Sequence, residues 1–143
     1  MKLIVDASVA LKWFLPDEPW ADRAIRLLET DGELLAPEWI VPEVCNAVWK
    51  MVRNGRLSGE RGEHIVSLLP SFFVRLVPVV NEAPRAMAIA LTINHPVYDC
   101  FYVALAEREH VPLVTADNRL IARLAGTPWE QLLVSLGLDK GIH

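Results

Sequence analysis

The fold is decided at the start of the chain, by the stretch Leu3-Ile4-Val5-Asp6-Ala7-Ser8. Three consecutive apolar residues that end on an aspartate are typical of a short strand buried on both faces. The pattern then changes to helical spacing, with Val9, Leu11 and Trp13 as apolar residues and Ser8 as a candidate helix N-cap. The chain therefore begins with a strand that leads directly into a helix, which is typical of an α/β fold.

The same alternation continues along the chain. Further strands are predicted at 34–36, 73–77, 112–115 and 131–134, and further helices from about Pro19 to Thr30, at 43–53, from Ser58 to about 70, at 81–93, at 96–109 and at 118–124. Short apolar strands that alternate with helices are typical of a parallel sheet covered on both faces. The sequence of residues 1–143 contains no repeat, linker or low-complexity segment, so a single domain is expected.

Composition and charge exclude several classes of protein. The 143 residues are 52% hydrophobic and 22% charged, which excludes a disordered or fibrous chain. No apolar run approaches the roughly 18 residues of a membrane-spanning helix, and Asp6 interrupts the apolar N-terminus before a signal peptide can form. A cytoplasmic protein without a membrane partner is therefore expected. The net charge of -4 argues against a protein that holds nucleic acid by bulk positive charge.

The cysteines and histidines form no zinc-binding pattern. Cys45 and Cys100 each lie in an apolar helical pattern, where a free cysteine packs as a small hydrophobe and no disulfide framework is implied. No two histidines have the spacing of metal ligands. Surface or loop positions are expected for His64, His95, His110 and His143.

Two aspartates follow predicted strands. Asp6 ends the first strand, and Asp117 comes directly after the strand at 112–115. In an open parallel sheet, ligands bind outside the carboxyl ends of the strands, where both carboxylates are expected to lie. Each aspartate also precedes a predicted helix, so a role as helix N-cap is an equal alternative.

Two further carboxylates lie in the first turns of predicted helices. Glu43 begins a helix with a polar face that includes Asn46 and Lys50, and a solvated helix end is the plainer interpretation of this residue alone. Asp99 is different, because its neighbours Tyr102 and Val103 indicate a face turned toward the sheet. A buried carboxylate needs a cation, a metal or several hydrogen-bond donors.

Four carboxylates at one edge of the sheet predict a divalent metal site. Like charges repel one another there unless a cation lies between them, and oxygen ligands without His or Cys favour Mg²⁺, with Mn²⁺ as the alternative. Mg²⁺ commonly contacts substrate phosphates, so phosphoryl transfer or phosphodiester hydrolysis is expected. Ser8 and Thr115 are candidate donors to the carboxylates, and a helix cap and a strand end are their alternative roles.

Four blocks of sequence carry a family resemblance: Ile4–Trp13, Pro42–Ala47, Tyr98–Ala106 and Thr115–Leu120. In this order, and across nearly the whole chain, they resemble the PIN-domain ribonucleases, and most closely the VapC toxins. The resemblance implies a PIN-like three-layer α/β fold with a central parallel five-stranded sheet flanked by helices.

The resemblance also implies a function. It implies an endoribonuclease that depends on Mg²⁺ or Mn²⁺, acts on tRNA, rRNA or mRNA, forms a homodimer and is inhibited by a VapB-type antitoxin. The catalytic and metal-binding residues that it implies are Asp6, Glu43, Asp99 and Asp117, supported by Ser8, Thr115 and Asn46.

Basic and aromatic residues near these positions are candidates for contact with RNA. Basic residues follow two of the carboxylates in the sequence: Lys50, Arg53, Arg56 and Arg61 after Glu43, and Arg119 and Arg123 after Asp117. Lys50, Arg53 and Arg119 are the first candidates to contact phosphates, and a solvated surface is the alternative. Trp13 and Trp39 could stack on unpaired bases, or could belong to the core or to a subunit interface.

Competing functions differ in the residues that they require. A receiver or haloacid-dehalogenase phosphotransfer protein also has an aspartate after its first strand, but here Ala7 and Ser8 follow Asp6, and no lysine follows Thr115. Within the PIN fold, the alternatives are an RNA-processing nuclease that is not a toxin, and a non-catalytic module for RNA binding or dimerisation. The non-catalytic module would lack an acidic residue, whereas all four are present in this sequence.

Overall fold

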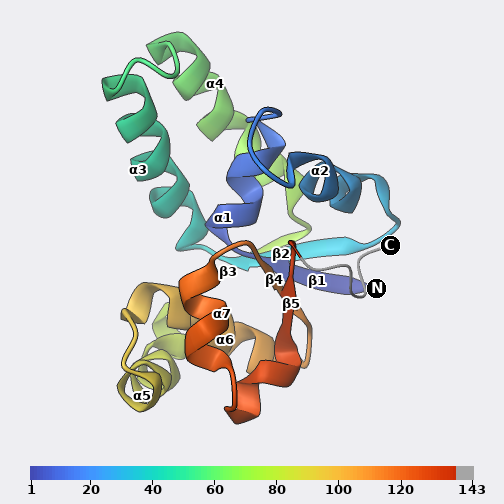
Figure 1. The fold of residues 1–143 in the computed structure, drawn as a ribbon, viewed down its shortest axis with the longest axis vertical. Coiled ribbons are helices and arrows are strands. Elements are labelled where there is room, and N and C mark those ends of the chain that lie inside the picture. Colours follow the sequence, from blue (N-terminus) through green and yellow to red (C-terminus); the bar gives the residue numbers. More distant parts are fainter. Residues whose placement is uncertain (138–143) are drawn as a thin grey trace.

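A parallel sheet of five strands forms the centre of the protein (Figure 1). The structure is a computed structural model and describes residues 1–137. The strands are β1 (Lys2–Val5), β2 (Glu33–Pro37), β3 (Arg75–Val77), β4 (Leu113–Thr115) and β5 (Leu133–Ser135). They follow the order β3-β2-β1-β4-β5, and every neighbouring pair is parallel. The predicted parallel sheet is thereby confirmed.

Helices cover both faces of this sheet (Figure 1). One side carries α1 (Ala7–Ala10), α2 (Ala21–Glu29), α3 (Ile40–Arg53) and α4 (Gly59–Leu68), and the other carries α5 (Ala83–Ile93), α6 (Val97–Glu109) and α7 (Asn118–Leu124). Short 3-10 turns lie at Leu11–Trp13, Leu69–Phe72, Val80–Glu82 and Pro128–Leu132. The predicted three-layer α/β fold is therefore confirmed. No helix among residues 1–137 is long and apolar enough to cross a membrane.

The ends of several elements differ from the prediction. The helix predicted from Glu43 begins three residues earlier, at Ile40, because Pro42 in the first turn lacks only an N–H that has no acceptor within the helix. The strand predicted at 73–77 begins only at Arg75, because Phe73 still ends the preceding 3-10 turn as its C-cap. The last strand begins at Leu133, after a 3-10 turn.

The N-cap of the first helix is Asp6, so the prediction that Ser8 caps this helix is wrong. Asp6 has an extended backbone, and its Oδ1 accepts the Val9 N–H at 3.2 Å. Ser8 lies inside α1, where its hydroxyl donates to the Asp6 carboxylate. By contrast, Ser58 caps α4 as predicted and accepts the Arg61 N–H at 3.0 Å.

The strand order places the carboxyl end of β1 at the point where the chain changes direction. From β1 the chain adds β2 and β3 on one side, and it then returns to add β4 and β5 on the other. In open parallel sheets a crevice forms at such a point, outside the carboxyl ends of the two central strands. These ends are Val5, followed by Asp6, and Thr115.

Candidate functional site

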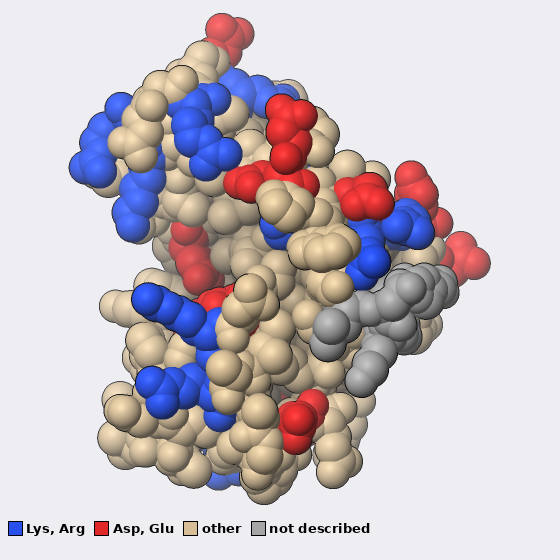
Figure 2. All heavy atoms as spheres, viewed as in Figure 1, with Lys and Arg blue, Asp and Glu red and all other residues tan. Residues whose placement is uncertain are grey.

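Four elements bring the four predicted carboxylates to one edge of the sheet. Asp6 follows β1, Glu43 and Asp99 lie in the first turns of α3 and α6, and Asp117 is the N-cap of α7. Burial raises the pKa of Glu43 to about 7, and the charges of the other three carboxylates act in the same direction. The four groups are therefore close enough to influence one another. Figure 2 shows acidic side chains in the hollow between the start of α3 and α7.

Asp6 is the most buried of the four carboxylates, with 5% of its surface exposed. Ser8 Oγ donates to Oδ1 at 2.5 Å, and the Thr115 hydroxyl donates to Oδ2. These two hydroxyls in turn accept the backbone N–H groups of Ala116 and Asp117, each at 3.0 Å. Burial raises the pKa of Asp6 to about 6, although these hydrogen bonds act to lower it. The structure thus places both predicted hydroxyls on Asp6.

Glu43 is tied to α6 by a tyrosine. The fully buried Tyr102 donates its hydroxyl to Glu43 Oε1 at 2.5 Å, which joins two helices from opposite faces of the sheet. Burial, followed by the charge of Glu43, holds the pKa of Tyr102 well above its usual value, so the phenol remains a donor. The sequence placed Tyr102 on the same face as Asp99 but did not reveal its partner.

Asp99 pairs with a histidine that the sequence reasoning missed. His95 Nε2 lies 2.6 Å from Asp99 Oδ2, and the His95 side chain is only 6% exposed. His95 lies in a loop, as expected, and its ring packs on the first turn of α6. The spacing of four residues from Asp99 is the signal that could have found it. His64 and His110 are exposed as predicted, and His143 lies outside the described residues.

Three of the carboxylates keep one oxygen without a hydrogen bond to residues 1–137. Glu43 uses Oε1 for Tyr102, and Asp99 uses Oδ2 for His95. Asp117 caps α7 with Oδ1, which accepts the N–H groups of Arg119 and Leu120 at 2.9 and 3.4 Å. The second oxygen of each carboxylate remains available to a cation.

These donors fit a hydrated divalent cation. Within residues 1–137 no three of the His, Cys, Asp and Glu side chains are arranged to hold a metal ion directly. Mg²⁺ does not require such a cage, because it usually keeps several waters and binds through one or two carboxylates. Such an ion would offset the negative charge of the four carboxylates, two of which have raised pKa values. The three carboxylate oxygens without a hydrogen bond would face the ion or its waters.

A cleft of about 610 Å³ lies beside two of the carboxylates. Asp99 and Asp117 line one part of it, and the arginines of α7, Arg119 and Arg123, line another. A polyanion in this cleft would meet cationic side chains next to the acidic cluster. Figure 2 shows this basic surface over α7, below the acidic hollow.

The basic residues of α3 lie farther from the carboxylates. Lys50 and Arg53 are exposed in the last turn of α3, about 10 Å and about 15 Å along the helix axis from Glu43 at 1.5 Å per residue. The exposed Asn46 lies between them and Glu43. Arg56 pairs with Glu18 at 3.3 Å. Of the candidate RNA contacts, Arg119 and Arg123 therefore share a cleft with Asp99 and Asp117, and Arg119 is the one of the three first candidates that does so.

The two candidate tryptophans have different surroundings. Trp13 is buried, packs on Phe72 and Phe73, and donates its indole N–H to the Ala24 carbonyl at 2.9 Å, so it belongs to the core and cannot stack on a base. Trp39 is only partly buried and stacks on Tyr98.

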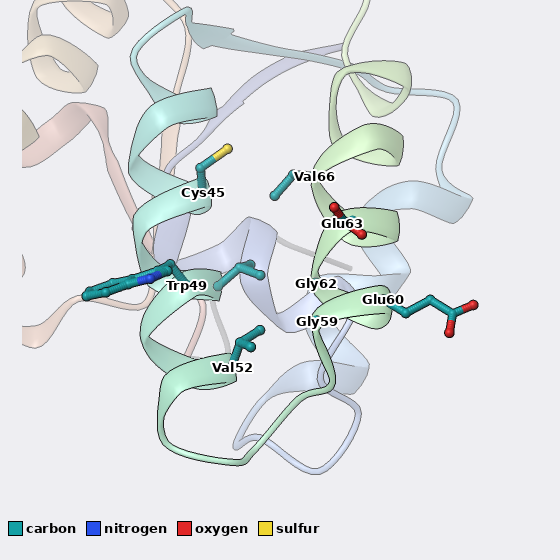
Figure 3. A pocket seen from close by; sticks show the side chains of 9 residues that line it. Cys45, Trp49, Val52, Gly59, Glu60, Gly62, Glu63 and Val66 are labelled. Carbon is teal, nitrogen blue, oxygen red and sulfur yellow. The ribbon is translucent and has the colours of Figure 1, made fainter.

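Both cysteines have apolar surroundings. Cys45 lines an apolar groove of about 470 Å³ between α3 and α4, together with Val52 and Val66, whereas the neighbouring Trp49 ring points away from the groove (Figure 3). Cys100 is fully buried, and its burial, reinforced by the charge of Asp99, raises the pKa of its thiol to about 11. Neither cysteine forms a disulfide, and the packing role predicted for Cys100 is confirmed.

Comparisons with known proteins agree with this architecture. The fold and the acidic edge define a PIN domain, and the model of the PIN domain family matches residues 3–126. The chain is 34% identical over 122 residues to Ribonuclease VapC3 of Pyrobaculum aerophilum, an alignment that covers 84% of this chain and 92% of that protein. It therefore belongs to the VapC ribonucleases of the PIN-domain family, as the four sequence blocks indicated.

Solved structures share the fold at low sequence identity. The sarcin–ricin loop cleaving toxin VapC20 of Mycobacterium tuberculosis superposes with a TM-score of 0.67 at 15% identity, over 87% of this chain and 95% of that one. VapBC2 of Rickettsia felis, bound to a DNA fragment from its promoter, gives a TM-score of 0.65 at 12% identity, over 94% and 98% of the two chains. At these identities the likeness establishes the fold alone.

Proposed function

We propose that this protein is a metal-dependent endoribonuclease and the toxin of a VapBC-type toxin–antitoxin pair. The observation that carries the proposal is the convergence of four carboxylates from four separate elements at one edge of the sheet. Its membership of the VapC ribonucleases supports the reaction class. The substrate would be RNA, either tRNA, rRNA or mRNA.

The proposed residues of the cation site are Asp6, Glu43, Asp99 and Asp117, which would hold a hydrated ion partly through its waters. Mg²⁺ is the first choice and Mn²⁺ the alternative, because all the donors are oxygens. When bound, such an ion lowers the pKa of a water that attacks the phosphodiester, and it offsets the charge that develops on the phosphate.

The remaining polar residues would orient this site and hold the substrate. Ser8 and Thr115 fix both oxygens of Asp6, and Tyr102 fixes Glu43. Arg119 lines the cleft beside Asp117 and is the proposed contact for an RNA phosphate. Further contacts are proposed at Asn46, Lys50 and Arg53, for an RNA that extends along α3.

The proposed partners follow from the family. A VapB-type antitoxin would inhibit the enzyme, and two copies of the chain would form a homodimer. We place the protein in the cytoplasm, where its RNA substrate lies. We treat residues 1–143 as one domain, which is supported by a family match that extends over most of the chain.

Cleavage of a labelled RNA by the purified protein tests the reaction. Asp99→Asn and Glu43→Gln should each lower the cleavage rate by more than about 100-fold, because each removes a carboxylate charge from the metal site. EDTA should abolish cleavage and Mg²⁺ or Mn²⁺ should restore it. Glu60→Gln, an exposed carboxylate on α4, serves as the matched control and should cleave at the wild-type rate. Full activity of Asp99→Asn would show that the site assignment is wrong.

A further inference from the structure

An aromatic pair links the two helices that carry Glu43 and Asp99. The rings of Trp39 and Tyr98 lie 4.7 Å apart with an interplanar angle of 6°, so they are stacked in parallel. The other aromatic pairs in residues 1–137 are tilted or edge-on and belong to the core around Trp13. Among residues 1–137, Trp39 and Tyr98 are therefore the aromatic pair whose rings stack in parallel.

The two partners differ in how they meet the solvent. Trp39 is partly buried against the core, and its indole nitrogen is buried without a hydrogen-bond partner in the described residues. Tyr98 is 55% exposed, and its hydroxyl makes no hydrogen bond within residues 1–137. Trp39 covers one face of the Tyr98 ring, and more than half of the Tyr98 surface is open to solvent. A tyrosine held flat in this way is fixed in orientation before any ligand arrives.

This pair stands next to the carboxylates in both helices. The carbonyl of Trp39 accepts the Glu43 N–H at 3.1 Å, so the tryptophan lies one helical turn before that carboxylate. Tyr98 directly precedes Asp99 in the chain. Figure 1 shows the start of α6 below the start of α3, on the side of the molecule that holds the acidic hollow. A nucleotide whose phosphate lies at the carboxylates would have its base within reach of the Tyr98 ring.

We propose that Tyr98, backed by Trp39, is a stacking platform for an unpaired base next to the phosphate that is cleaved. The proposal rests on the proposed ribonuclease function and adds a residue that positions the substrate. Every base has a π-face, and an aromatic side chain can stack on it only where the base is free of its neighbours in a helix. The Tyr98 ring would therefore hold the unpaired nucleotide on one side of the cleaved phosphate and fix its orientation.

Binding of short RNA oligonucleotides tests the platform without relying on cleavage. In a Glu43→Gln background, which should prevent cleavage, Tyr98→Leu should weaken the affinity for a single-stranded oligonucleotide by about 5- to 100-fold, the range expected for one stacked base. Tyr98→Phe keeps the ring and should bind within twofold of the parent. A 2-aminopurine base at the cleavage position should be quenched by the parent and by Tyr98→Phe but not by Tyr98→Leu. A fully paired duplex should bind more weakly than the single strand and be insensitive to Tyr98→Leu.

The matched control is Trp20→Leu. Trp20 is also an aromatic residue at the start of a helix and is 45% exposed, but it precedes α2, which carries no proposed RNA contact, and its substitution should leave single-strand binding within twofold. Equal affinity and equal quenching in Tyr98→Leu and its parent would overturn the proposal. An altered oligomeric state with unchanged RNA binding would also overturn it, because the pair would then serve a protein interface. Failure of the ribonuclease function itself would look different, since the wild type would neither cleave nor bind RNA.

Discussion

Asp6 combines two roles that the sequence presented as alternatives. Its Oδ1 accepts the Val9 N–H and so caps α1, while the same carboxylate belongs to the acidic cluster. Asp117 likewise caps α7 with one oxygen and leaves the other free within the described chain. Capping therefore leaves Asp117 an oxygen for the proposed cation, whereas both oxygens of Asp6 already accept hydrogen bonds. Capping fixes the orientation of each carboxylate.

The Thr115 hydroxyl provides a test at the scale of one residue. Thr115→Val keeps the side-chain shape but removes the donor to Asp6 and the acceptor for the Asp117 N–H. We expect the free energy of unfolding to fall by about 1–3 kcal/mol, since buried polar groups lose partners. The pKa of Asp6 should also rise beyond about 6, because the hydrogen bond from Thr115 lowers it. Urea unfolding and the pH profile of RNA cleavage measure the two effects.

Thr115→Ser is the control for this substitution, since it retains the hydroxyl. It should keep the wild-type pH profile and lose little stability. If Thr115→Val cleaves RNA with the wild-type pH dependence, the hydroxyl does not control the ionisation of Asp6.

At the scale of elements, the first turn of α6 shows what the sequence can and cannot predict. Helical spacing was enough to place Asp99 and Tyr102 on one face turned toward the sheet, and Tyr102 is indeed fully buried. The contact of Tyr102 with Glu43 joins residues 59 positions apart, and it depends on how α3 packs across the sheet edge. No local pattern contains that information.

Local steric detail explains the other errors. Ser8 has the chemistry of an N-cap, but the chain enters its helix two residues earlier, at Asp6, so the hydroxyl turns back to that carboxylate. The position of Trp13 in the sequence allowed both a core role and a role in base stacking. Its packing against Phe72 and Phe73, which only the structure shows, assigns it to the core. Strand and helix positions were predictable to within a few residues because apolar periodicity and local capping signals mark them.

The α3–α4 pair offers a test with two glycines of one helix. A Cβ on Gly62 would lie 3.0 Å from Val52 Cγ2 and 3.1 Å from Val48 Cγ1, whereas a Cβ on Gly59 would meet nothing within 4 Å. Gly59→Ala should therefore stabilise the protein by up to about 1 kcal/mol through helix propensity. Gly62→Ala should destabilise it by about 1 kcal/mol, because the branched valines resist displacement. Guanidinium unfolding of both variants measures the difference, and equal stabilisation by the two would contradict the close packing.

At the scale of the whole molecule, the acidic cluster should link stability to pH. The pKa of Asp6 rises from 3.8 to about 6 and that of Glu43 from 4.5 to about 7, so the folded protein binds these protons more tightly than the unfolded chain. The stability contributed by the protonated acids is complete below about pH 4 and is lost as the pH rises through 6 and 7. For Asp6 the loss is on the order of 2–3 kcal/mol.

Thermal unfolding in EDTA between pH 4.5 and 8 measures this linkage. The Tm of the wild type should fall across that range relative to the Tm of the double variant Asp6→Asn with Glu43→Gln, which lacks both titrating groups. Millimolar Mg²⁺ should raise the wild-type Tm at pH 8 and leave the double variant unchanged, because the ion binds the ionised carboxylates of the folded state. Parallel pH curves for the two proteins would show that these acids do not titrate as described.

The strand order also determines when during synthesis the site can exist. The central strand β1 is made first, whereas its neighbour β4 comes after α6. A nascent chain made as far as α5 already contains Asp6 and Glu43. It still lacks Asp99, and it lacks Thr115 and Asp117, which lie in β4 and in the loop after it. The ribosome is itself built of RNA, the proposed substrate. On the proposed site, the nascent chain therefore gains ribonuclease activity only after Asp117 has emerged from the ribosome.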